Sequence, residues 1–320
     1  MRGWYYFLLA QTYGPTHFTL EPTVGMVTTA NKTPVEQIYD QVVTDLRFAA
    51  DNLPNTQSEY GRITKPGALA ILSKVLLTKG DYQEASNIAN MVINSFGLSL
   101  LPGYGNLWTM ANERNSEVLW AVNYANNVAL NAGSNVLHSM FLMAYSDLPG
   151  MTIDVNNGLP EGRWIPTLFY LNLFDEANDS RFDATFKQAW IANNAATLPK
   201  WTTSEAAQNP ALAGLVGQNK FAVGDTAIYL SKYSINNSEQ NYSIRYRYKT
   251  YDIDDLYNSN GTIKNINQYF SLRKFDDPTR ATAMEKQSAR NANVIRLGEV
   301  YLIAAEAQVR LGKADSAAFL

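Results

Sequence analysis

Apolar residues recur at helical spacing through the first hundred residues of the chain. After Thr33 and Pro34, apolar side chains return every three or four residues, at Ile38, Val42, Leu46, Ala49 and Leu53. This is the period of one face of an α-helix. Thr33 is placed to cap this helix and Pro34 to occupy its first position, and Pro54 ends it.

Three further helices are predicted in the same region. They cover RGWYYFLLAQTYG at the start of the chain, a segment from about Pro66 to Lys79, and a segment from Asp81 to about Phe96. The first of them has no capping residue ahead of it, and the last residues, KADSAAFL, resemble a helix that stops after about two turns. We therefore expect the sequence to be an internal fragment of a longer protein.

A helical turn closed by glycine occurs near both ends of the chain. The two stretches are LLTKGDYQEASNIA (76–89) and VRLGKADSAAFL (309–320), which align with Gly80 opposite Gly312 and Ala85 opposite Ala317. In helix-hairpin repeats such as the tetratricopeptide type, a glycine closes one helix and a small residue lets the next one pack closely. The spacing favours such a repeat no more strongly than an unrelated pair of helical turns.

The stretch NVIRLGEVYLIAAEAQVRLGKADSA (293–317) is predicted to be helical and carries two carboxylates, Glu299 and Glu306. On a helix their Cα atoms would be roughly 10.5 Å apart, on one face. The carboxylates of glycosidases are separated by only about 5–9.5 Å. Arg296 and Arg310 stand at spacings that favour ion pairs with Glu299 and Glu306, respectively, on the helix surface. We interpret both glutamates as structural, not as an acid/base pair.

The region between the helical ends has a different composition. Residues 98–290 are rich in Asn, Gly, Tyr and Trp and contain many turn signals, such as LPGYGN and NNGLPEG. Strands are predicted at Val118–Tyr124 and Ser243–Tyr251, and a short helix at Ile165–Phe174. The prediction is a mostly α fold with three parts: a helical-hairpin scaffold at 1–97, a long loop-rich ligand-binding insertion at 98–290, and more scaffold at 291–320.

Composition excludes several classes of function. A net charge of -3 over 320 residues, with signs interspersed, gives no basic stripe, so no nucleic-acid partner is expected. The chain has no Cys and two distant histidines, His17 and His138, which argues against thiolate chemistry, a zinc site and a serine–histidine triad. The apolar run Trp4–Ala10 is too short to span a bilayer.

Five ordered segments give the chain a family resemblance. They are YDQVVTDLRFAADNLP, YGRITKPGALAILSKVLLTKGDYQEA, SEVLWAVNY, LFDEANDSRFDATFKQAW and RLGEVYLIAAEAQVRLG. Together they resemble the SusD/RagB family of outer-membrane nutrient-binding lipoproteins of Bacteroidetes. The first helix fits as well, although Gly3 replaces the usual Ala.

The resemblance implies tetratricopeptide-like helix pairs, a loop-rich binding part and a SusC-like TonB-dependent transporter as partner. It also implies a cell-surface, outer-membrane location through a lipid anchor on a Cys, which this sequence does not contain. The ligand it implies is an oligosaccharide, or a peptide as in the RagB branch.

Aromatic and polar residues of the middle region are the candidate ligand contacts. Glycan sites pair aromatic platforms with a few placed polar groups. The candidates are Trp164, Trp201, Trp190, Tyr145, Arg163 and Asp147. The alternative is that these aromatics fill small cores beneath long loops. Trp120 and Trp108 are assigned to the core.

Metal and cofactor sites are weakly indicated. DVNNG (154–158) and DIDD (252–255) gather the oxygens that calcium prefers, but neither has EF-hand spacing. GYGNLW lacks the third glycine of a dinucleotide loop. We therefore expect no metal, no cofactor and no catalysis. A glycoside hydrolase and a tetratricopeptide scaffold that binds protein remain alternatives.

Overall fold

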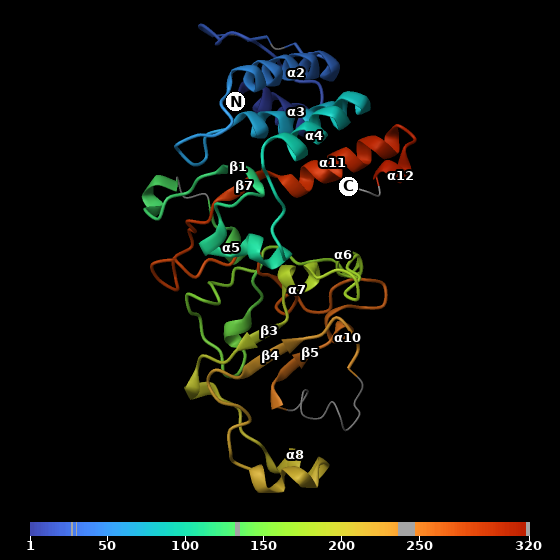
Figure 1. Ribbon diagram of the computed structural model, residues 1–320. Helices are drawn as coiled ribbons and strands as arrows, with labels where there is room; N and C mark the ends of the chain where they lie inside the picture. The colour runs from blue at the N-terminus through green and yellow to red at the C-terminus, as the bar shows by residue number, and fades with distance from the viewer. Residues whose placement is uncertain (27, 30, 132–134, 236–246, 318–320) are drawn as a thin grey trace. The chain divides into compact units, whose positions relative to one another are not determined.

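The computed structural model describes residues 1–26, 28–29, 31–131, 135–235 and 247–317. Its regular structure is mostly helical, with a few short strands, which confirms the predicted fold class (Figure 1). The chain forms two compact units. Unit 1 comprises Met1–Leu101, Arg114–Asn123 and Asn291–Leu320, and unit 2 comprises Pro102–Glu113 and Tyr124–Arg290.

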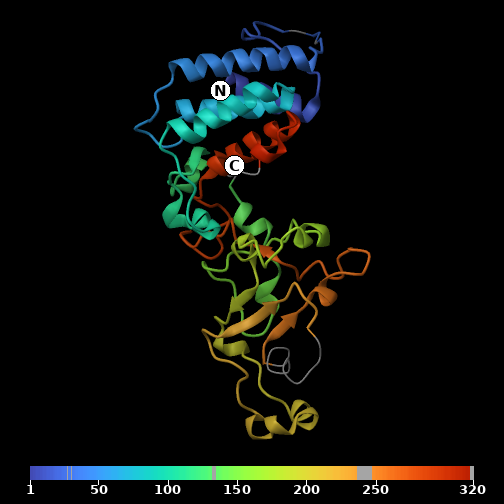
Figure 2. The same cartoon turned by 45° about the vertical axis from the view of Figure 1, so that its right-hand side comes forward.

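Unit 1 is an array of packed helices. They are α1 (Arg2–Tyr13), α2 (Val35–Asn52), α3 (Lys65–Lys79), α4 (Tyr82–Ser95), α11 (Leu297–Arg310) and α12 (Ala314–Ala317). Consecutive helices α1 to α4 pack against one another, and α11 packs against α4 (Figure 2). Nearly every side chain from Pro66 to Leu76 in α3 is buried, as expected for a helix covered on several sides. Helices α1 to α4 and α11 share one core with the buried Trp120, whose assignment to the core is confirmed.

The turn from α3 to α4 has the predicted glycine geometry. Gly80 adopts φ +95°, and its N–H donates to the carbonyl oxygens of Leu76 and Leu77. The aligned Gly312 after α11 also has positive φ, at +75°. Only glycine takes this conformation without strain, so both helices end where the pattern predicts. Ala85 is fully buried, whereas Ala317 is half-buried, and residues 318–320 of the predicted second hairpin lie outside the described residues.

Two element boundaries differ from the prediction. Helix α2 has Pro34 at its N-cap and no capping side chain, so the cap predicted at Thr33 is wrong. Thr33 instead pairs with Thr16, to whose carbonyl oxygen its backbone N–H donates. Residues 292–296 form strand β7 (Ala292–Arg296), which pairs antiparallel with β1 (Val118–Val122). The helix predicted from Asn293 therefore begins at Leu297. Strand β1 confirms the strand predicted there.

Both glutamates of α11 are ion-paired on the helix surface. Glu306 binds Arg310 at 3.4 Å, as predicted. Glu299 binds Lys74 of α3 at 2.7 Å, and Arg296 binds Glu117 at 2.5 Å. The predicted Arg296–Glu299 pair is wrong because Arg296 lies in β7, where strand pairing directs it to Glu117.

Unit 2 is built from short elements. Its helices are α5 (Leu137–Met140), α6 (Leu168–Asn172), α7 (Arg181–Thr185), α8 (Thr203–Gln208) and α10 (Ile253–Leu256). Its 3-10 turns are η1 (Tyr104–Trp108), η2 (Met110–Asn112), η3 (Val128–Asn131), η4 (Tyr145–Asp147), η5 (Ala195–Thr197) and η6 (Pro210–Leu215). Helix α6 lies within the predicted helix Ile165–Phe174.

Two small sheets organise this unit. Strands β2 (Phe186–Lys187) and β6 (Ser271–Leu272) pair antiparallel. Strand β4 (Thr226–Leu230) lies between β3 (Ala189–Ile191), antiparallel to it, and β5 (Lys249–Tyr251), parallel to it. Strand β5 confirms the end of the strand predicted at Ser243–Tyr251, whose residues 243–246 lie outside the described residues.

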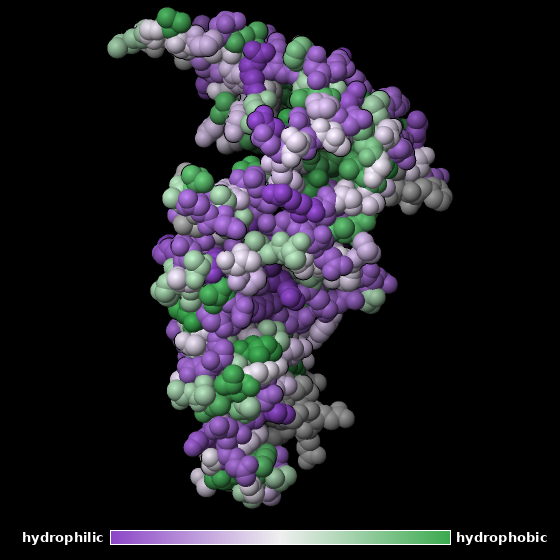
Figure 3. Space-filling model, turned by 60° about the vertical axis from the view of Figure 1, so that its left-hand side comes forward, coloured by the Kyte–Doolittle hydropathy of each residue, from purple (hydrophilic) through white to green (hydrophobic). Residues whose placement is uncertain are grey.

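Neither a spanning helix nor a single continuous apolar face is seen in the described part of the chain as drawn in Figure 3. No helix there combines the length and the apolar character needed to span a bilayer. On the face drawn in Figure 3, hydrophobic residues form separate patches among hydrophilic ones.

Candidate ligand-binding site

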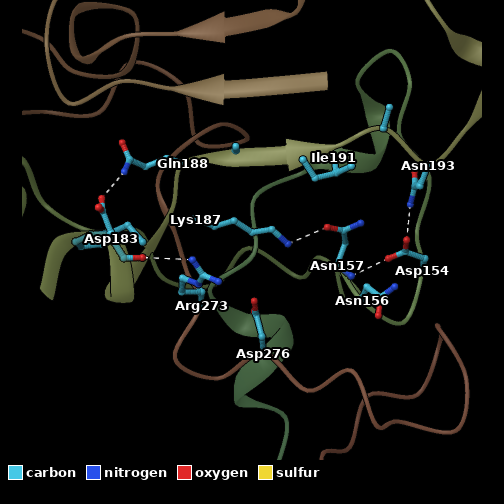
Figure 4. A pocket seen from close by; sticks show the side chains of 13 residues that line it. Asp154, Asn156, Asn157, Asp183, Lys187, Gln188, Ile191, Asn193, Arg273 and Asp276 are labelled. Atoms are coloured by element: carbon cyan, nitrogen blue, oxygen red, sulfur yellow. Dashed lines mark hydrogen bonds between the residues drawn. The ribbon is translucent and has the colours of Figure 1, made fainter. Parts of the chain in front are cut away.

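A polar cavity of about 780 Å³ opens in unit 2. Its size falls in the range of roughly 300–1,000 Å³ that is typical of ligand sites. Figure 4 shows Lys187 reaching across it toward Asn157, with Asp183 and Gln188 on one side and Asp154 and Asn193 on the other. The cavity is lined by Asp154, Asn156, Asn157, Asp183, Phe186, Lys187, Gln188, Ala189, Ile191, Ala192, Asn193, Arg273 and Asp276.

The DVNNG loop forms one wall. The Asp154 carboxylate accepts hydrogen bonds from Asn157 N at 2.7 Å and from Asn193 Nδ2 at 2.6 Å. Gly158 closes the loop with φ +87°, and a Cβ there would lie 2.6 Å from Leu142 Cδ1. The aspartate thus shapes a turn that depends on glycine and holds Asn156 and Asn157 at the cavity.

Neither acidic cluster considered for calcium gathers a metal site. In the described ranges, no group of three or more His, Cys, Asp or Glu side chains is placed to hold a metal ion. In DIDD, the Asp252 carboxylate caps α10 by accepting from the N–H groups of Asp254 and Asp255. That cluster is explained by helix capping.

Lys187 crosses the floor of the cavity from β2. Its ammonium donates to Asn157 Oδ1 at 2.8 Å and lies 4.0 Å from the ring centroid of Trp190. Burial lowers the pKa of Lys187. The cation is held by one amide oxygen and an aromatic face, an arrangement that stabilises a partly desolvated ammonium.

Three further polar groups line the cavity: Asp183 from α7, and Arg273 and Asp276 from the segment after β6. Gln188 donates to Asp183 Oδ1 at 2.7 Å, and Arg273 donates to the Asp183 carbonyl at 3.4 Å. Pairing of β2 with β6 brings Arg273 here, since its own N–H donates to Thr185 O. Burial raises the pKa of Asp276 to about 6. The cavity therefore offers hydrogen-bond donors and acceptors of both charges and of neutral amide type.

Two of the predicted contact residues lie in the core instead. Tyr145 and Trp190 have no exposed surface and stack with ring centroids 4.4 Å apart. The Tyr145 hydroxyl donates to Gly158 O at 2.5 Å. A sugar cannot stack on a ring that has no exposed face, which corrects the binding role predicted for both. They support the cavity from behind, because Trp190 underlies Lys187 and Tyr145 anchors the DVNNG loop.

Trp201 and Asp147 do not line the cavity either. Trp201 is 9% exposed, and the Lys220 ammonium lies 5.0 Å from its ring centroid. Its covered ring offers little surface for stacking. Asp147 is exposed at the end of η4. The structure does not bring these two residues together with the other candidates.

Trp164 is the predicted aromatic that the structure leaves accessible, at 51% exposure. It packs on Phe141, with centroids 5.1 Å apart, and Phe141 stacks on Phe275 at the same distance. Arg163 next to it is exposed. Phe275 directly precedes Asp276 in the sequence, but neither Trp164, Phe141 nor Phe275 is among the residues that line the cavity. We keep Trp164 and Arg163 as proposed ligand contacts.

Two family profiles match the sequence. The one described as "Starch-binding associating with outer membrane" matches residues 1–77, and the one described as "SusD family" matches residues 116–319, more than half of the chain. The chain belongs to the SusD family. A SusD-like protein of Formosa agariphila is 36% identical to it over 104 residues, which make up 31% of this chain and 20% of that protein.

Solved structures of SusD-like fold align over nearly the whole chain. Surface glycan-binding protein A from Bacteroides uniformis gives a TM-score of 0.61 at 18% identity, covering 97% of this chain and 53% of that one. The protein of the same name from Bacteroides thetaiotaomicron, solved with laminarihexaose, gives a TM-score of 0.55 at 17% identity. This alignment covers 97% of the present chain and 56% of that one. At these identities the likeness shows the fold. The chain spans little more than half the length of these SusD-like proteins.

Sequence reasoning missed the polar cavity of this SusD-family chain. Its members Lys187, Arg273 and Asp276 are separated along the sequence and follow no motif. DVNNG was noticed, but only as a possible calcium loop. The available signal was the density of Asn and Asp in a turn-rich segment.

Proposed function

We propose that this chain binds oligosaccharides at the cavity of unit 2 without cleaving them. The observation that carries the proposal is the lining of that cavity, where carboxylates, amides, a lysine and an arginine converge. Sugar hydroxyls both donate and accept hydrogen bonds, so a site that recognises them needs both kinds of partner. Trp164, which is exposed and packs on the half-buried Phe141, supplies apolar surface for a sugar face.

Relatives support the same ligand class. One SusD-like structure is described as a laminarin-binding protein, with a TM-score of 0.51 to this chain, and another was solved with laminarihexaose. These ligands are therefore the first probes for this chain. A peptide ligand is the competing outcome of the same experiment.

The experiment is an isothermal titration of the purified chain with laminarihexaose and xylogluco-oligosaccharide, and with a mixed hexapeptide pool as the comparison. We expect saturable binding of an oligosaccharide and loss of affinity in Arg273→Ala and Asp276→Ala. Tyr233→Ala, at a position that is 60% exposed and outside the cavity, is the matched control. Binding of the peptides with no binding of any sugar would contradict the proposal.

The absence of catalysis is tested on the same samples. The two glutamates of α11 are ion-paired, and Asp154 and Asp183 in the cavity already accept hydrogen bonds. We expect chromatography to recover each oligosaccharide intact after prolonged incubation. Release of shorter sugars by the parent and not by Asp276→Ala would show a hydrolase.

We further propose that the whole protein works at the outer membrane with a SusC-like TonB-dependent transporter. Membership of the SusD family supports this, as does the description of the profile over residues 1–77. Affinity purification of the full-length protein from outer membranes should recover a TonB-dependent transporter. Recovery of the protein in the soluble fraction without one would contradict it.

A further inference from the structure

A second cavity, of about 650 Å³, adjoins the first in unit 2. Asp183, Arg273 and Asp276 line both. Because three residues are common to the two linings, the two cavities are neighbours that share these residues. The second one is lined by Gly103, Tyr104, Gly105, Asn106, Trp108, Thr109, Met110, Ser180, Asp183, Ala184, Arg273, Asp276, Pro278 and Arg290.

The second cavity has a wall formed by two adjoining aromatic rings. Tyr104 and Trp108 meet edge to face, with ring centroids 5.7 Å apart, and both are half-buried. The Lys274 ammonium lies 5.0 and 5.1 Å from the two centroids and donates to the Tyr104 hydroxyl at 2.9 Å. Trp108 was assigned to the core from the sequence, but it contributes to the cavity wall. A half-buried pair fixed by a lysine is a rigid surface for an apolar ligand face.

Arg290 adds a donor at the same place. Its side chain is 9% exposed, and one terminal nitrogen donates to Trp108 O at 3.0 Å and to Asp276 O at 2.5 Å. Its Nε is buried and has no hydrogen-bond partner among the described residues. Arg290 is among the residues that line the second cavity, so it brings a guanidinium to that wall.

We propose that the two cavities form one binding cleft for an extended, uncharged oligosaccharide, with Arg273 and Asp276 at its centre and the Tyr104–Trp108 wall as a second subsite. This rests on the proposed function. Each cavity alone has the volume of a ligand site. A ligand that occupies both cavities must therefore be longer than a single sugar unit. The joint lining carries three carboxylates (Asp154, Asp183 and Asp276) and three cations (Lys187, Arg273 and Arg290), and this balance favours a neutral glycan over a polyanion.

The test titrates the purified chain with laminaribiose, laminarihexaose and a hexameric oligogalacturonate. Asn156→Ala changes the first cavity alone and Tyr104→Ala the second alone. Tyr104→Phe keeps the ring, and Tyr233→Ala is the aromatic control outside both cavities. For the hexasaccharide, we expect Asn156→Ala and Tyr104→Ala each to weaken binding about tenfold, and Tyr104→Phe to stay within about threefold of the parent. For the disaccharide, we expect only one of the two alanine variants to weaken binding. The oligogalacturonate should bind at least about tenfold more weakly than laminarihexaose.

Three results overturn the inference in distinguishable ways. If laminarihexaose binds and loses affinity with Asn156→Ala but not with Tyr104→Ala, the second subsite is wrong and the proposed function stands. If the parent binds none of the sugars, the proposed function fails and the cleft fails with it. Tighter binding of the oligogalacturonate would overturn the neutral ligand class. Thermal melting of each variant shows that it is folded before its affinity is compared.

Discussion

Tyr145 and Trp190 stack face to face in the core of unit 2, at 4.4 Å between ring centroids and 20° between planes. Both were predicted to contact ligand, and both are fully buried. Their position places two large, fully buried aromatic rings behind the polar cavity instead of in it. The stack therefore contributes to stability, and it sets the height of the Lys187 ammonium above the Trp190 ring.

Trp190→Ala should destabilise unit 2 strongly. Truncating a fully buried Trp removes its packing and leaves a cavity, at a cost of about 3–5 kcal/mol. Trp164→Ala, at a position that is 51% exposed, is the matched control and should change the free energy of unfolding by less than about 1 kcal/mol. Chemical denaturation followed by tryptophan fluorescence measures both. Equal effects of the two substitutions would contradict the assigned burial.

His138 should make the fold sensitive to acid. The side chain is 2% exposed, and neither ring nitrogen has a hydrogen-bond partner in the described part of the chain. Burial, aided by the charge of Arg280, lowers its pKa to about 4. The unfolded state then binds the proton more readily between pH 6.5 and 4, so the contribution of His138 to the free energy of unfolding falls by about 3 kcal/mol as pH falls across that window.

The measurement is the free energy of unfolding from pH 7 to pH 4 in the parent and in His138→Gln. Because glutamine does not titrate and the opposite contribution of Asp276 is common to both proteins, the difference in free energy of unfolding between parent and variant should change by about 3 kcal/mol over this range. His17→Gln removes the other histidine, at an exposed position, and is the matched control. An unchanged slope in His138→Gln would show that other groups cause the acid sensitivity.

Asp276→Asn should stabilise the protein at neutral pH. Burial raises the pKa of Asp276 to about 6, so the folded state binds its proton more tightly than the unfolded state does. The contribution of this group is fully present below about pH 4 and is lost as pH rises through 6. Asparagine stays neutral, and the variant should therefore gain up to about 3 kcal/mol over the parent at pH 7 and little at pH 4. Paired denaturation curves at the two pH values test this, and a gain that is independent of pH would contradict it.

The ion pair between Arg296 and Glu117 should matter more than that between Lys74 and Glu299. The Glu117 side chain is 8% exposed, whereas those of Lys74 and Glu299 are each about one third exposed. Arg296→Ala leaves a buried carboxylate without its cation, at a cost of about 3–5 kcal/mol. Lys74→Ala should cost less than about 1 kcal/mol. Thermal and chemical unfolding of the two variants measures the difference. A larger loss of stability in Lys74→Ala than in Arg296→Ala would contradict the burial of Glu117.

Local patterns predicted the helices of unit 1 well. The apolar period of α2 and the left-handed Gly80 between α3 and α4 depend on residues close in sequence, which is why periodicity and capping rules find them. Strand β7 was missed because its pairing partner β1 lies far away along the chain. The same distant pairing decided the partner of Arg296.

The candidate site could not be predicted in the same way. Burial of Tyr145 and Trp190 depends on how short elements of unit 2 meet, and a turn-rich segment gives no period from which to infer it. The cavity gathers the DVNNG loop, β2 and the segment after β6, so its members share no spacing. Trp164 was recognised as a candidate because its own neighbours are turn residues, and it is the predicted aromatic that stays exposed.

A crystal structure of the chain with bound laminarihexaose tests the central claim most directly. The account predicts a sugar unit with hydroxyl oxygens about 2.7–3.2 Å from the side chains of Arg273 and Asp276. It also predicts that further units enter the cavity lined by Asn156 or the one lined by Tyr104. An oligosaccharide bound away from both Arg273 and Asp276 would contradict the account.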